Sequence, residues 1–453
     1  MDKFDFLSPL DYRYFKEEFS EFLSENARIR YQALVEAALV KALARQRVCS
    51  TKIAAEVLRA AQKVTAAEVY KEEAVTRHDV RALANVLRSK VSDSAKPFVH
   101  LGATSYDIVD TANALRFRHA AKKLVLPSLI ALEKTWISLA LKNKGTLQIG
   151  RTHGQHAVPI TFGFTMASYI ERLGNRVKEI GRAEQNLCGK FSGAVGAYNA
   201  SSLIVKDPLR LEADVMKFLG LKPCRHSTQV VSPEPMQDLI NALLGAFTVL
   251  ANFSDDMRHL SRTEIGEIAE EFGAKQVGSS TMPHKRNPVN FENVKSLWKV
   301  FVPRMATVYM DSVSEHQRDL TNSASQRFLG EFFAALVYSA DKLRDVSRKI
   351  VVDEKGMKRN IDQSATSVVA EPLYILLAKY GHKDAHEAVR TLAMKAQKSG
   401  ASVFDLAMDD KKLKLYLLQF SKKEIELVKN PALYTGLSAK KAEQVSMHWR
   451  KEF

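Results

Sequence analysis

One loop of this chain carries more potential chemistry than any other segment. Residues 278–288 read Gly-Ser-Ser-Thr-Met-Pro-His-Lys-Arg-Asn-Pro. A serine hydroxyl, here Ser279 with Ser280 as the alternative, can remove a proton once cationic and backbone donors acidify it. Lys285 and Asn287 supply donors that can meet an anion developing next to a carboxylate. The loop therefore predicts an elimination reaction that passes through a carbanion.

A second segment, residues 150–163, contains His153 and His156. An imidazole titrates near neutral pH, so His153 held beside a carboxylate such as Glu292 could protonate a leaving group. A histidine followed by glycine is also a common turn element, and the residue types alone leave both interpretations open. Two histidines without a nearby third ligand and without an HExxH pattern do not indicate a metal site.

The third segment runs from Val99 to Asp110 and precedes an amphipathic helix. Thr104 and Asp107 have the spacing of a variant capping box. Ser105 follows at a position where the N-terminal donors of a helix can bind a carboxylate. The same geometry therefore suits both a helix start and a binding site.

Helices must position these groups, because apolar residues recur at helical spacing along most of the chain. The clearest stripe alternates steps of four and three residues and predicts a bundle seam through Phe162, Met166, Tyr169, Leu173, Val177 and Ile180. Similar stripes predict long helices over residues 294–308 and 332–350. Pro303 should kink the first of these two helices. Asp207-Pro208 predicts another helix start, and Gly220 predicts its end.

The pattern as a whole predicts an all-α fold in three parts. We expect a smaller N-terminal helical domain over residues 1–102 and a central bundle of long helices over residues 103–350. A C-terminal helical domain should cover residues 351–453.

Composition sets the outer bounds on function. The chain has 453 residues, of which 46% are apolar and 26% charged, as in an ordinary soluble globular protein. Residues 1–8 lack the basic start of a signal peptide. The apolar run 239–253 contains two asparagines and predicts a buried core helix, not a membrane span. Cys49, Cys188 and Cys224 have no CxxC spacing and indicate free thiols in a reducing cytoplasm.

The formal net charge of +16 could attract nucleic acid or a polyanionic small molecule. Many lysines alternate with Leu, Ile and Glu near the C-terminus, which predicts a solvated helix face. These lysines are Lys411, Lys412, Lys414, Lys422, Lys423, Lys440 and Lys441. Zinc-finger spacing and RNA-binding aromatic motifs do not accompany them, so a small-molecule partner is favoured over nucleic acid.

Residues 278–288 closely resemble the signature loop of the fumarase/aspartase superfamily, whose members release fumarate by breaking a C–N or C–O bond. The resemblance implies a three-part, almost wholly helical fold and a homotetramer whose active sites are shared between subunits. It also implies a loop that closes over bound substrate. We expect no metal and no organic cofactor, because the sequence contains no P-loop or dinucleotide fingerprint.

Within this superfamily the chain is most similar to the adenylosuccinate lyase family. Its characteristic segments resemble, in the expected order, residues 77–80, 150–157, 227–229 and 316–327. The resemblance implies cleavage of adenylosuccinate to AMP and fumarate, and of the succinylaminoimidazole-carboxamide ribotide (SAICAR) to its aminoimidazole product (AICAR) and fumarate. Ser279 would be the base, Lys285 and Asn287 would stabilise the anion, and His153 paired with Glu292 would be the acid.

Further residues would bind substrate on the same resemblance. They are Arg13, Tyr14, Arg77, His78, Asp79, His100, Thr104, Ser105, Thr152, Gln229, Met282, Asn287, Arg318, Ser323 and Arg327. Three positions depart from the family pattern. Val158 and Gln317 stand where glutamate is common, and Tyr106 follows the Thr-Ser pair.

Two other functions stay open. The cycloisomerase that acts on 3-carboxy-cis,cis-muconate has nearly the same loop. At the segment where this chain has His153, however, the sequences of that family resemble Gly-Arg-Thr-Trp. A non-catalytic scaffold could use the same fold and bind nucleic acid through its basic surface. The intact set of Ser279, Lys285, Asn287, His153 and Glu292 argues against a scaffold.

Overall fold

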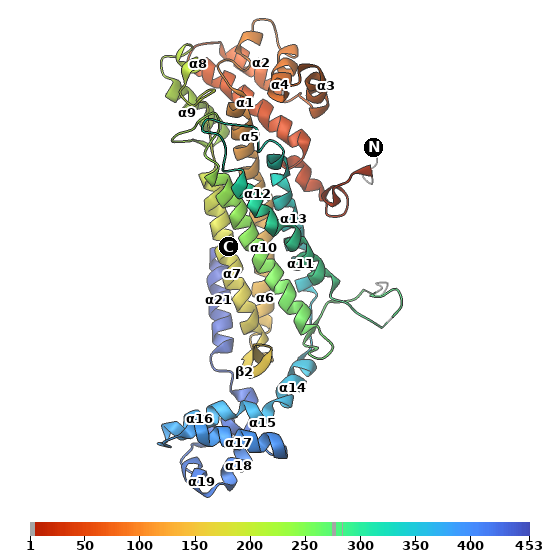
Figure 1. Cartoon of the computed structure of the whole chain (residues 1–453), viewed down its shortest axis with the longest axis vertical. Coiled ribbons are helices and arrows are strands. Elements are labelled where there is room, and N and C mark those ends of the chain that lie inside the picture. Colours follow the sequence, from red (N-terminus) through yellow and green to blue (C-terminus); the bar gives the residue numbers. More distant parts are fainter. Residues whose placement is uncertain (1–4, 274–277, 283) are drawn as a thin grey trace. The chain divides into compact units, whose positions relative to one another are not determined.

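The computed structural model describes residues 5–273, 278–282 and 284–453, and α-helices make up most of these ranges. The first helices are α1 (Glu25–Arg45), α2 (Thr51–Ala61), α3 (Ala66–Thr76), α4 (Asp79–Ser89), α5 (Ser105–Ala120), α6 (Leu126–Lys142), α7 (Phe162–Asn186), α8 (Asn199–Ser202), α9 (Pro208–Leu219) and α10 (Glu234–Leu260). They are followed by α11 (Val289–Phe301), α12 (Met305–Met310), α13 (Leu329–Arg348), α14 (Glu354–Gln363), α15 (Ala365–Val368), α16 (Ala370–Lys379), α17 (Ala385–Ser399), α18 (Val403–Asp409), α19 (Lys411–Leu417), α20 (Lys422–Lys429) and α21 (Ser438–Glu452). The predicted all-α fold is confirmed (Figure 1).

The strands are few and short, and they form three two-stranded sheets in the described part of the chain. They are β1 (Leu147–Thr152), β2 (Gln155–Thr161), β3 (Cys188–Gly189), β4 (Lys222–Pro223), β5 (Ile268–Ala269) and β6 (Val351–Val352). The apolar periodicity did not predict the β1–β2 hairpin.

Packing divides the chain into two compact units. Unit 1 comprises Met1–Ile130, Asn175–Thr248 and Ser296–Asp341. Unit 2 comprises Ala131–Gly174, Val249–Lys295 and Lys342–Phe453. The boundaries expected at residues 102 and 350 remain predictions.

In unit 1, helix α1 packs against α2, α5 and α9. Aromatic rings join the other helices of this unit. Phe117 of α5 stacks on Phe333 of α13 with ring centroids 5.1 Å apart, and Phe301 of α11 meets Phe332 edge-on at 5.8 Å. A π-helical turn at Ala121–Val125 continues α5 toward α6.

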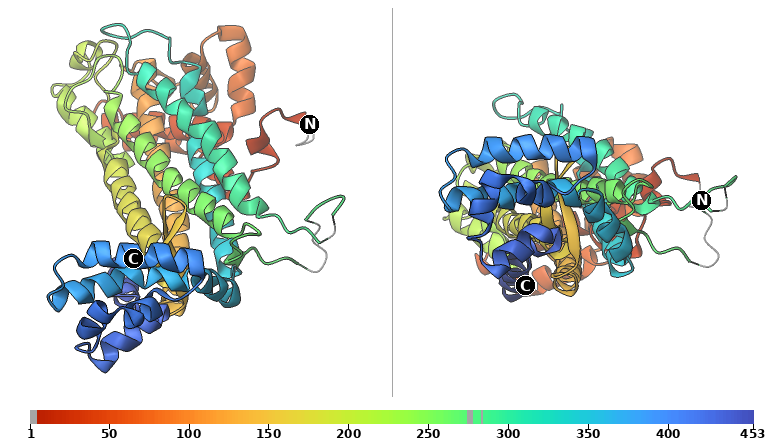
Figure 2. Two further views of the ribbon diagram at one scale, coloured as in Figure 1. Left: turned by 60° about the horizontal axis from the view of Figure 1, so that its bottom comes forward. Right: turned by 90° about the horizontal axis from the view of Figure 1, so that it is seen from below.

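Unit 2 has its own aromatic core. Phe253 of α10 lies 4.4 Å from Trp136 of α6, 5.2 Å from Tyr169 of α7 and 6.0 Å from Phe291 of α11, measured between ring centroids. A separate apolar cluster over residues 369–428 holds α16 to α20 together, and Figure 2 shows these C-terminal helices in blue.

The predicted helix patterns are confirmed at several points. All six residues of the Phe162–Ile180 stripe are buried along α7. Pro303 lies in a 3-10 turn, Val302–Arg304, that separates α11 from α12. The Asp207 side chain accepts from the Arg210 N–H at the start of α9, and Gly220 ends that helix with φ of 69°.

Two helical stretches are long and apolar enough to cross a membrane by length and composition alone. They are Ser105–Lys142 and Glu234–Leu260. The most apolar 18-residue stretch is 50% buried in the first and 61% buried in the second. Burial of this extent is what a packed helix bundle requires, and it agrees with the core helix expected around residues 239–253.

Candidate active site

A cavity of about 780 Å³ lies within unit 1 and gathers residues from five separate stretches of sequence. Eight residues predicted to bind substrate line it: Arg77, His78, Asp79, Ser105, Gln229, Arg318, Ser323 and Arg327. Residues that the sequence did not single out complete the wall, among them Arg28, Tyr70, Asn113 and Arg116.

The turn between α3 and α4 positions the first three of these residues. Arg77 ends α3 in the left-handed conformation, with φ of 55°. His78 caps α4, because its Nδ1 accepts from the Arg81 N–H at 3.3 Å. Asp79 then occupies the first turn, where a carboxylate is favoured by the helix dipole. One tight turn therefore presents an arginine, a histidine and an aspartate to the same cavity.

One face of α5 forms another wall. Ser105, Val109, Asn113 and Arg116 all line the cavity and are separated by helical steps of four, four and three residues. This spacing is the signal in the sequence that could have identified Arg116.

Positive charge is concentrated around Arg116. Burial, followed by the nearby Arg28 guanidinium, lowers the pKa of Arg116 to about 10. Arg28 itself is neutralised by Glu25, with Nη2 and Oε1 2.6 Å apart. A bound anion would therefore relieve repulsion and desolvation at Arg116.

Arg318 has two terminal nitrogens that are buried and without a hydrogen-bond acceptor among the described residues. Its guanidinium carbon lies 3.1 Å from the centroid of the Tyr106 ring. Tyr106, a departure from the family pattern, thus contacts a cavity arginine through a cation–π interaction. Buried donors without partners are rare in folded proteins, so these nitrogens are available to a ligand.

The expected capping box of Thr104 and Asp107 is present at the start of α5. The Thr104 N–H donates to the Asp107 carboxylate at 2.8 Å. Asp107 is fully buried and forms an ion pair with Lys190, with Oδ1 and Nζ 2.5 Å apart. The N-terminus next to Ser105 is therefore held from behind by a buried ion pair.

His100 was also predicted to bind substrate. It has a left-handed backbone with φ of 63°, and its Nδ1 lies 2.6 Å from the buried Glu36 carboxylate. Burial alone lowers the pKa of His100, but the charge and hydrogen bond of Glu36 outweigh burial and raise it.

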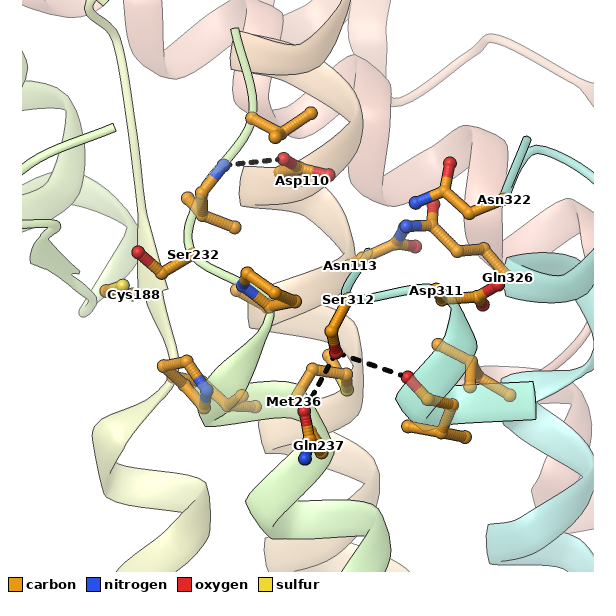
Figure 3. A pocket seen from close by; sticks show the side chains of 18 of the residues that line it. Asp110, Asn113, Cys188, Ser232, Met236, Gln237, Asp311, Ser312, Asn322 and Gln326 are labelled. Atoms are coloured by element: carbon orange, nitrogen blue, oxygen red, sulfur yellow. Dashed lines mark hydrogen bonds between the residues drawn. The ribbon is translucent and has the colours of Figure 1, made fainter. Parts of the chain in front are cut away.

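A smaller pocket of about 120 Å³ shares Asn113 and Gln326 with the cavity (Figure 3). Asp110 points toward the backbone N–H of Val231, which donates to it at 3.0 Å. Burial raises the pKa of Asp110 to about 6. Cys188 lines the same pocket.

The predicted catalytic loop belongs to unit 2. Ser279 Oγ accepts from the Met282 N–H at 3.1 Å and from the Thr281 N–H at 3.4 Å. Asn287 Nδ2 donates to the Gly278 carbonyl at 3.0 Å, which closes the loop on itself. Lys285 is exposed. Pro283 and residues 274–277, which belong to the loop and its flank, lie outside the described residues.

His153 occupies the turn of the β1–β2 hairpin. His153 and Gly154 both have positive φ, 55° and 75°, and Thr152 pairs with Gln155 on either side of them. Positive φ at both central residues is the type I′ geometry that matches the twist of a hairpin. The turn interpretation of His153 is therefore confirmed, and the turn also presents its side chain to solvent.

Glu292, the expected partner of His153, is exposed in the first turn of α11. In the described part of the chain, no hydrogen bond or ion pair joins the two residues. The carboxylate that orients the same hairpin is instead Glu267, which is buried and lies 2.6 Å from Arg151 Nη2. The His153–Glu292 pairing remains a prediction.

The remaining predicted residues do not line the cavity of unit 1. Arg13 is exposed, and the Tyr14 ring packs edge-on against Tyr338 at 5.1 Å. Thr152 and Met282 lie in unit 2 and are exposed. The described residues contain no group of three or more His, Cys, Asp or Glu that could hold a metal ion.

Family comparisons cover nearly the whole chain. Residues 12–300 match the family described as Lyase, and residues 314–422 match the family described as Adenylosuccinate lyase C-terminal. The adenylosuccinate lyase of Pyrococcus horikoshii is 36% identical over 436 residues, or 94% of each chain. That of Archaeoglobus fulgidus is 33% identical over 448 residues, or 98% of each chain.

Among solved structures, the 3-carboxy-cis,cis-muconate lactonizing enzyme of Pseudomonas putida has a TM-score of 0.86 and 25% identity, covering 98% of this chain and 99% of that one. A fumarate lyase of Mesorhizobium sp. BNC1 has the same fold, with a TM-score of 0.83 and 21% identity over 96% of this chain and 98% of that one. The fold is thus shared by a lactonizing enzyme and a fumarate lyase, whereas the sequence relatives and the C-terminal match are adenylosuccinate lyases. The chain belongs to the adenylosuccinate lyase family.

Proposed function

We propose that the protein cleaves adenylosuccinate to AMP and fumarate, and SAICAR to AICAR and fumarate. The observation that carries this proposal is the cavity of unit 1, where Arg77, Arg116, Arg318 and Arg327 converge. Both substrates carry a phosphate and two carboxylates. Guanidinium groups bind such anions through paired N–H donors.

The cavity also offers groups suited to the neutral part of a nucleotide. Gln229, Asn113 and Ser323 provide amide and hydroxyl groups, and the Tyr70 ring provides a flat apolar face. A site with arginines at its wall and a few polar groups between them fits a phosphorylated ligand better than a purely apolar one.

We propose that the loop removes a proton and stabilises the resulting anion. Ser279 removes the proton on the carbon beta to the departing nitrogen, and Lys285 and Asn287 stabilise the resulting anion. The two backbone N–H groups that point at Ser279 Oγ support this role, because such donors favour the deprotonated hydroxyl. His153 then protonates the nitrogen as the C–N bond breaks.

We further propose that the enzyme is a cytoplasmic homotetramer with active sites shared between subunits. The cavity contains none of the described loop residues and does not contain His153. The arginines of the cavity can hold a substrate, but the proposed base Ser279 does not line the cavity. A second copy of the chain would supply these groups by symmetric assembly.

The competing proposal is a muconate cycloisomerase, and the TM-score of 0.86 to the Pseudomonas putida enzyme is the observation in its favour. That substrate lacks a phosphate. The arginine cavity and the imidazole of His153 therefore favour the nucleotide, and offering 3-carboxy-cis,cis-muconate in a parallel assay separates the two proposals.

The direct test incubates the purified protein with adenylosuccinate and measures AMP and fumarate separately. Ser279→Ala should lower kcat by roughly 10²–10⁴-fold, because it removes the proposed base. Ser280→Ala is the matched control, since it deletes the neighbouring hydroxyl of the same loop and should leave kcat within a few fold.

Equal yields of AMP and fumarate that disappear in Ser279→Ala would support both substrate and base. Loss of turnover in Ser280→Ala with a nearly normal Ser279→Ala would move the base to the second serine. A folded wild type that turns over only the muconate would overturn the proposed substrate.

A further inference from the structure

Two cysteines that are distant in sequence lie side by side in unit 1. Cys188 belongs to β3, and Cys224 directly follows β4, which pairs with β3 in parallel. Their sulfur atoms are 3.1 Å apart. The Cys224 N–H donates to the Gly189 carbonyl at 2.9 Å, so backbone hydrogen bonding already holds Cys224 beside the strand that carries Cys188.

We propose that Cys188 and Cys224 form a reversible disulfide and so constitute an oxidative modification site of this protein. A disulfide has a sulfur–sulfur distance of about 2.05 Å, so the two atoms need to approach by only about 1 Å. The hydrogen bond from Cys224 to Gly189 holds the two segments together while the thiols are still reduced.

The reaction balances with a peroxide as the oxidant. The Cys188 thiolate attacks one peroxide oxygen, forming a sulfenic acid and releasing the first water after protonation. The Cys224 thiol then attacks the sulfenic sulfur, the S–S bond forms and a second water leaves. Two thiols lose two electrons and two protons in total, and one hydrogen peroxide becomes two waters.

The surroundings distinguish the two sulfurs. The hydrogen bond with the Cys224 thiol lowers the pKa of Cys188, which favours its thiolate. The same contact and burial raise the pKa of Cys224. Cys188 also lines the small pocket of Figure 3, which gives a small oxidant a route to its sulfur.

Cys49 provides an internal comparison within the same chain. Burial raises the pKa of its thiol. Its sulfur lies 3.6 Å from the Val40 carbonyl oxygen. Cys49 should therefore react more slowly than Cys188 and should stay a free thiol.

The disulfide would fasten a segment that lies behind the start of α5 to one that leads to the cavity. Lys190 follows β3 and pairs with Asp107 behind the start of α5. Ser227, three residues after Cys224, is joined to Ser192 by a hydroxyl–hydroxyl hydrogen bond of 2.6 Å. Gln229, which lines the cavity, comes two residues after Ser227. Because these contacts already exist with reduced thiols, the bond should lock the arrangement without reshaping it.

The test oxidises the full-length protein with hydrogen peroxide, blocks the remaining thiols with an alkylating agent and analyses the peptides by mass spectrometry. We expect two of the three thiols to be lost and one peptide pair, containing residues 188 and 224, to be about 2 Da lighter than the sum of its parts. Dithiothreitol should restore both thiols. These readouts are independent of the proposed lyase activity.

Cys188→Ser and Cys224→Ser are the matched variants, and Cys49→Ser is the control that should still form the bond. Oxidation should raise the Tm of wild type and of Cys49→Ser, because the cross-link restricts the unfolded chain. Oxidation should not raise the Tm of Cys188→Ser or of Cys224→Ser. Alkylation of both Cys188 and Cys224 in wild type after oxidation, bonds formed through Cys49, or an oxidised Tm equal to or below the reduced one would overturn the proposal.

Discussion

At the scale of single residues, the buried charges of this protein differ in whether they have partners. Asp107 and Lys190 are fully buried but satisfy one another. Glu133 is equally buried, and both of its carboxylate oxygens are without a hydrogen-bond partner among the described residues. Burial, assisted by the charge of Glu171, raises the pKa of Glu133 well above its ordinary value. An isolated buried carboxyl is stable only in its neutral form.

Glu133→Gln should therefore stabilise the protein increasingly as the pH rises. A carboxyl whose folded pKa is raised binds its proton more tightly when folded, so stability is lost as the pH climbs above the unfolded pKa near 4.5. Glutamine keeps the shape and cannot ionise. The Tm of the variant should exceed that of wild type by a few degrees at pH 8 and converge with it at pH 5. A constant difference across this range would contradict the assignment.

The His100–Glu36 pair gives the opposite dependence. The folded pKa of His100 is raised, so the pair stabilises the protein fully below pH 6.5 and loses this contribution as the pH rises through the folded pKa. Glu36→Gln removes the charge but can still accept from the His100 N–H, which now donates to Glu36 at 3.1 Å. Thermal unfolding should show the variant clearly less stable than wild type at pH 6 and much closer to it at pH 9. Equal deficits at both pH values would mean that charge is not the cause.

At the scale of elements, close contacts between helices decide which substitutions are tolerated. Helix α7 carries Gly174 and Gly181, and both lie in regular helix. A Cβ at Gly174 would lie 2.4 Å from the Trp449 ring of α21, whereas a Cβ at Gly181 would meet no atom within 4 Å. The indole also donates to Glu171 at 2.8 Å, so Trp449 is not free to move aside.

Gly174→Ala should accordingly destabilise the protein by roughly 1–3 kcal/mol through overpacking. Gly181→Ala, the matched control on the same helix, should be stabilising by about 0.5–1 kcal/mol because alanine has the higher helix propensity. Denaturant or thermal unfolding measures both. If the two variants behave alike, the contact of α21 with α7 at Trp449 is looser than described.

At the scale of the whole molecule, the candidate catalytic and substrate-binding residues fall into two sets. The cavity arginines lie in unit 1, while Ser279 and His153 lie in unit 2. If active sites combine these sets from different subunits, two inactive variants can repair one another. A variant altered in one set would still supply the other set intact.

Mixing Ser279→Ala with Arg318→Gln tests this arrangement. Random reassembly of equal amounts should restore about a quarter of the wild-type activity, because one site in four receives both intact sets. Each variant alone should stay inactive, and mixing either variant with itself is the control. No recovery after verified subunit exchange would place both sets on the same chain.

Much of the fold could be predicted from local patterns. The Phe162–Ile180 stripe, the Asp207 cap and the break at Pro303 each depend on residues a few positions apart. The hairpin at His153 was missed because a two-residue turn gives a weak signal beside long helical stripes. Its Thr-His-Gly-Gln sequence nevertheless contains the glycine that a type I′ turn favours.

The amino-acid sequence by itself determined the helices, the family and the identity of the residues that could bind or react, because these follow from spacing and residue type along the chain. Only the tertiary structure decided that Arg116 joins the cavity, that Glu133 is buried without a partner and that Cys188 meets Cys224. These three properties depend on which surfaces pack together after the helices have formed. Such packing unites residues far apart in the chain, and no local periodicity encodes it.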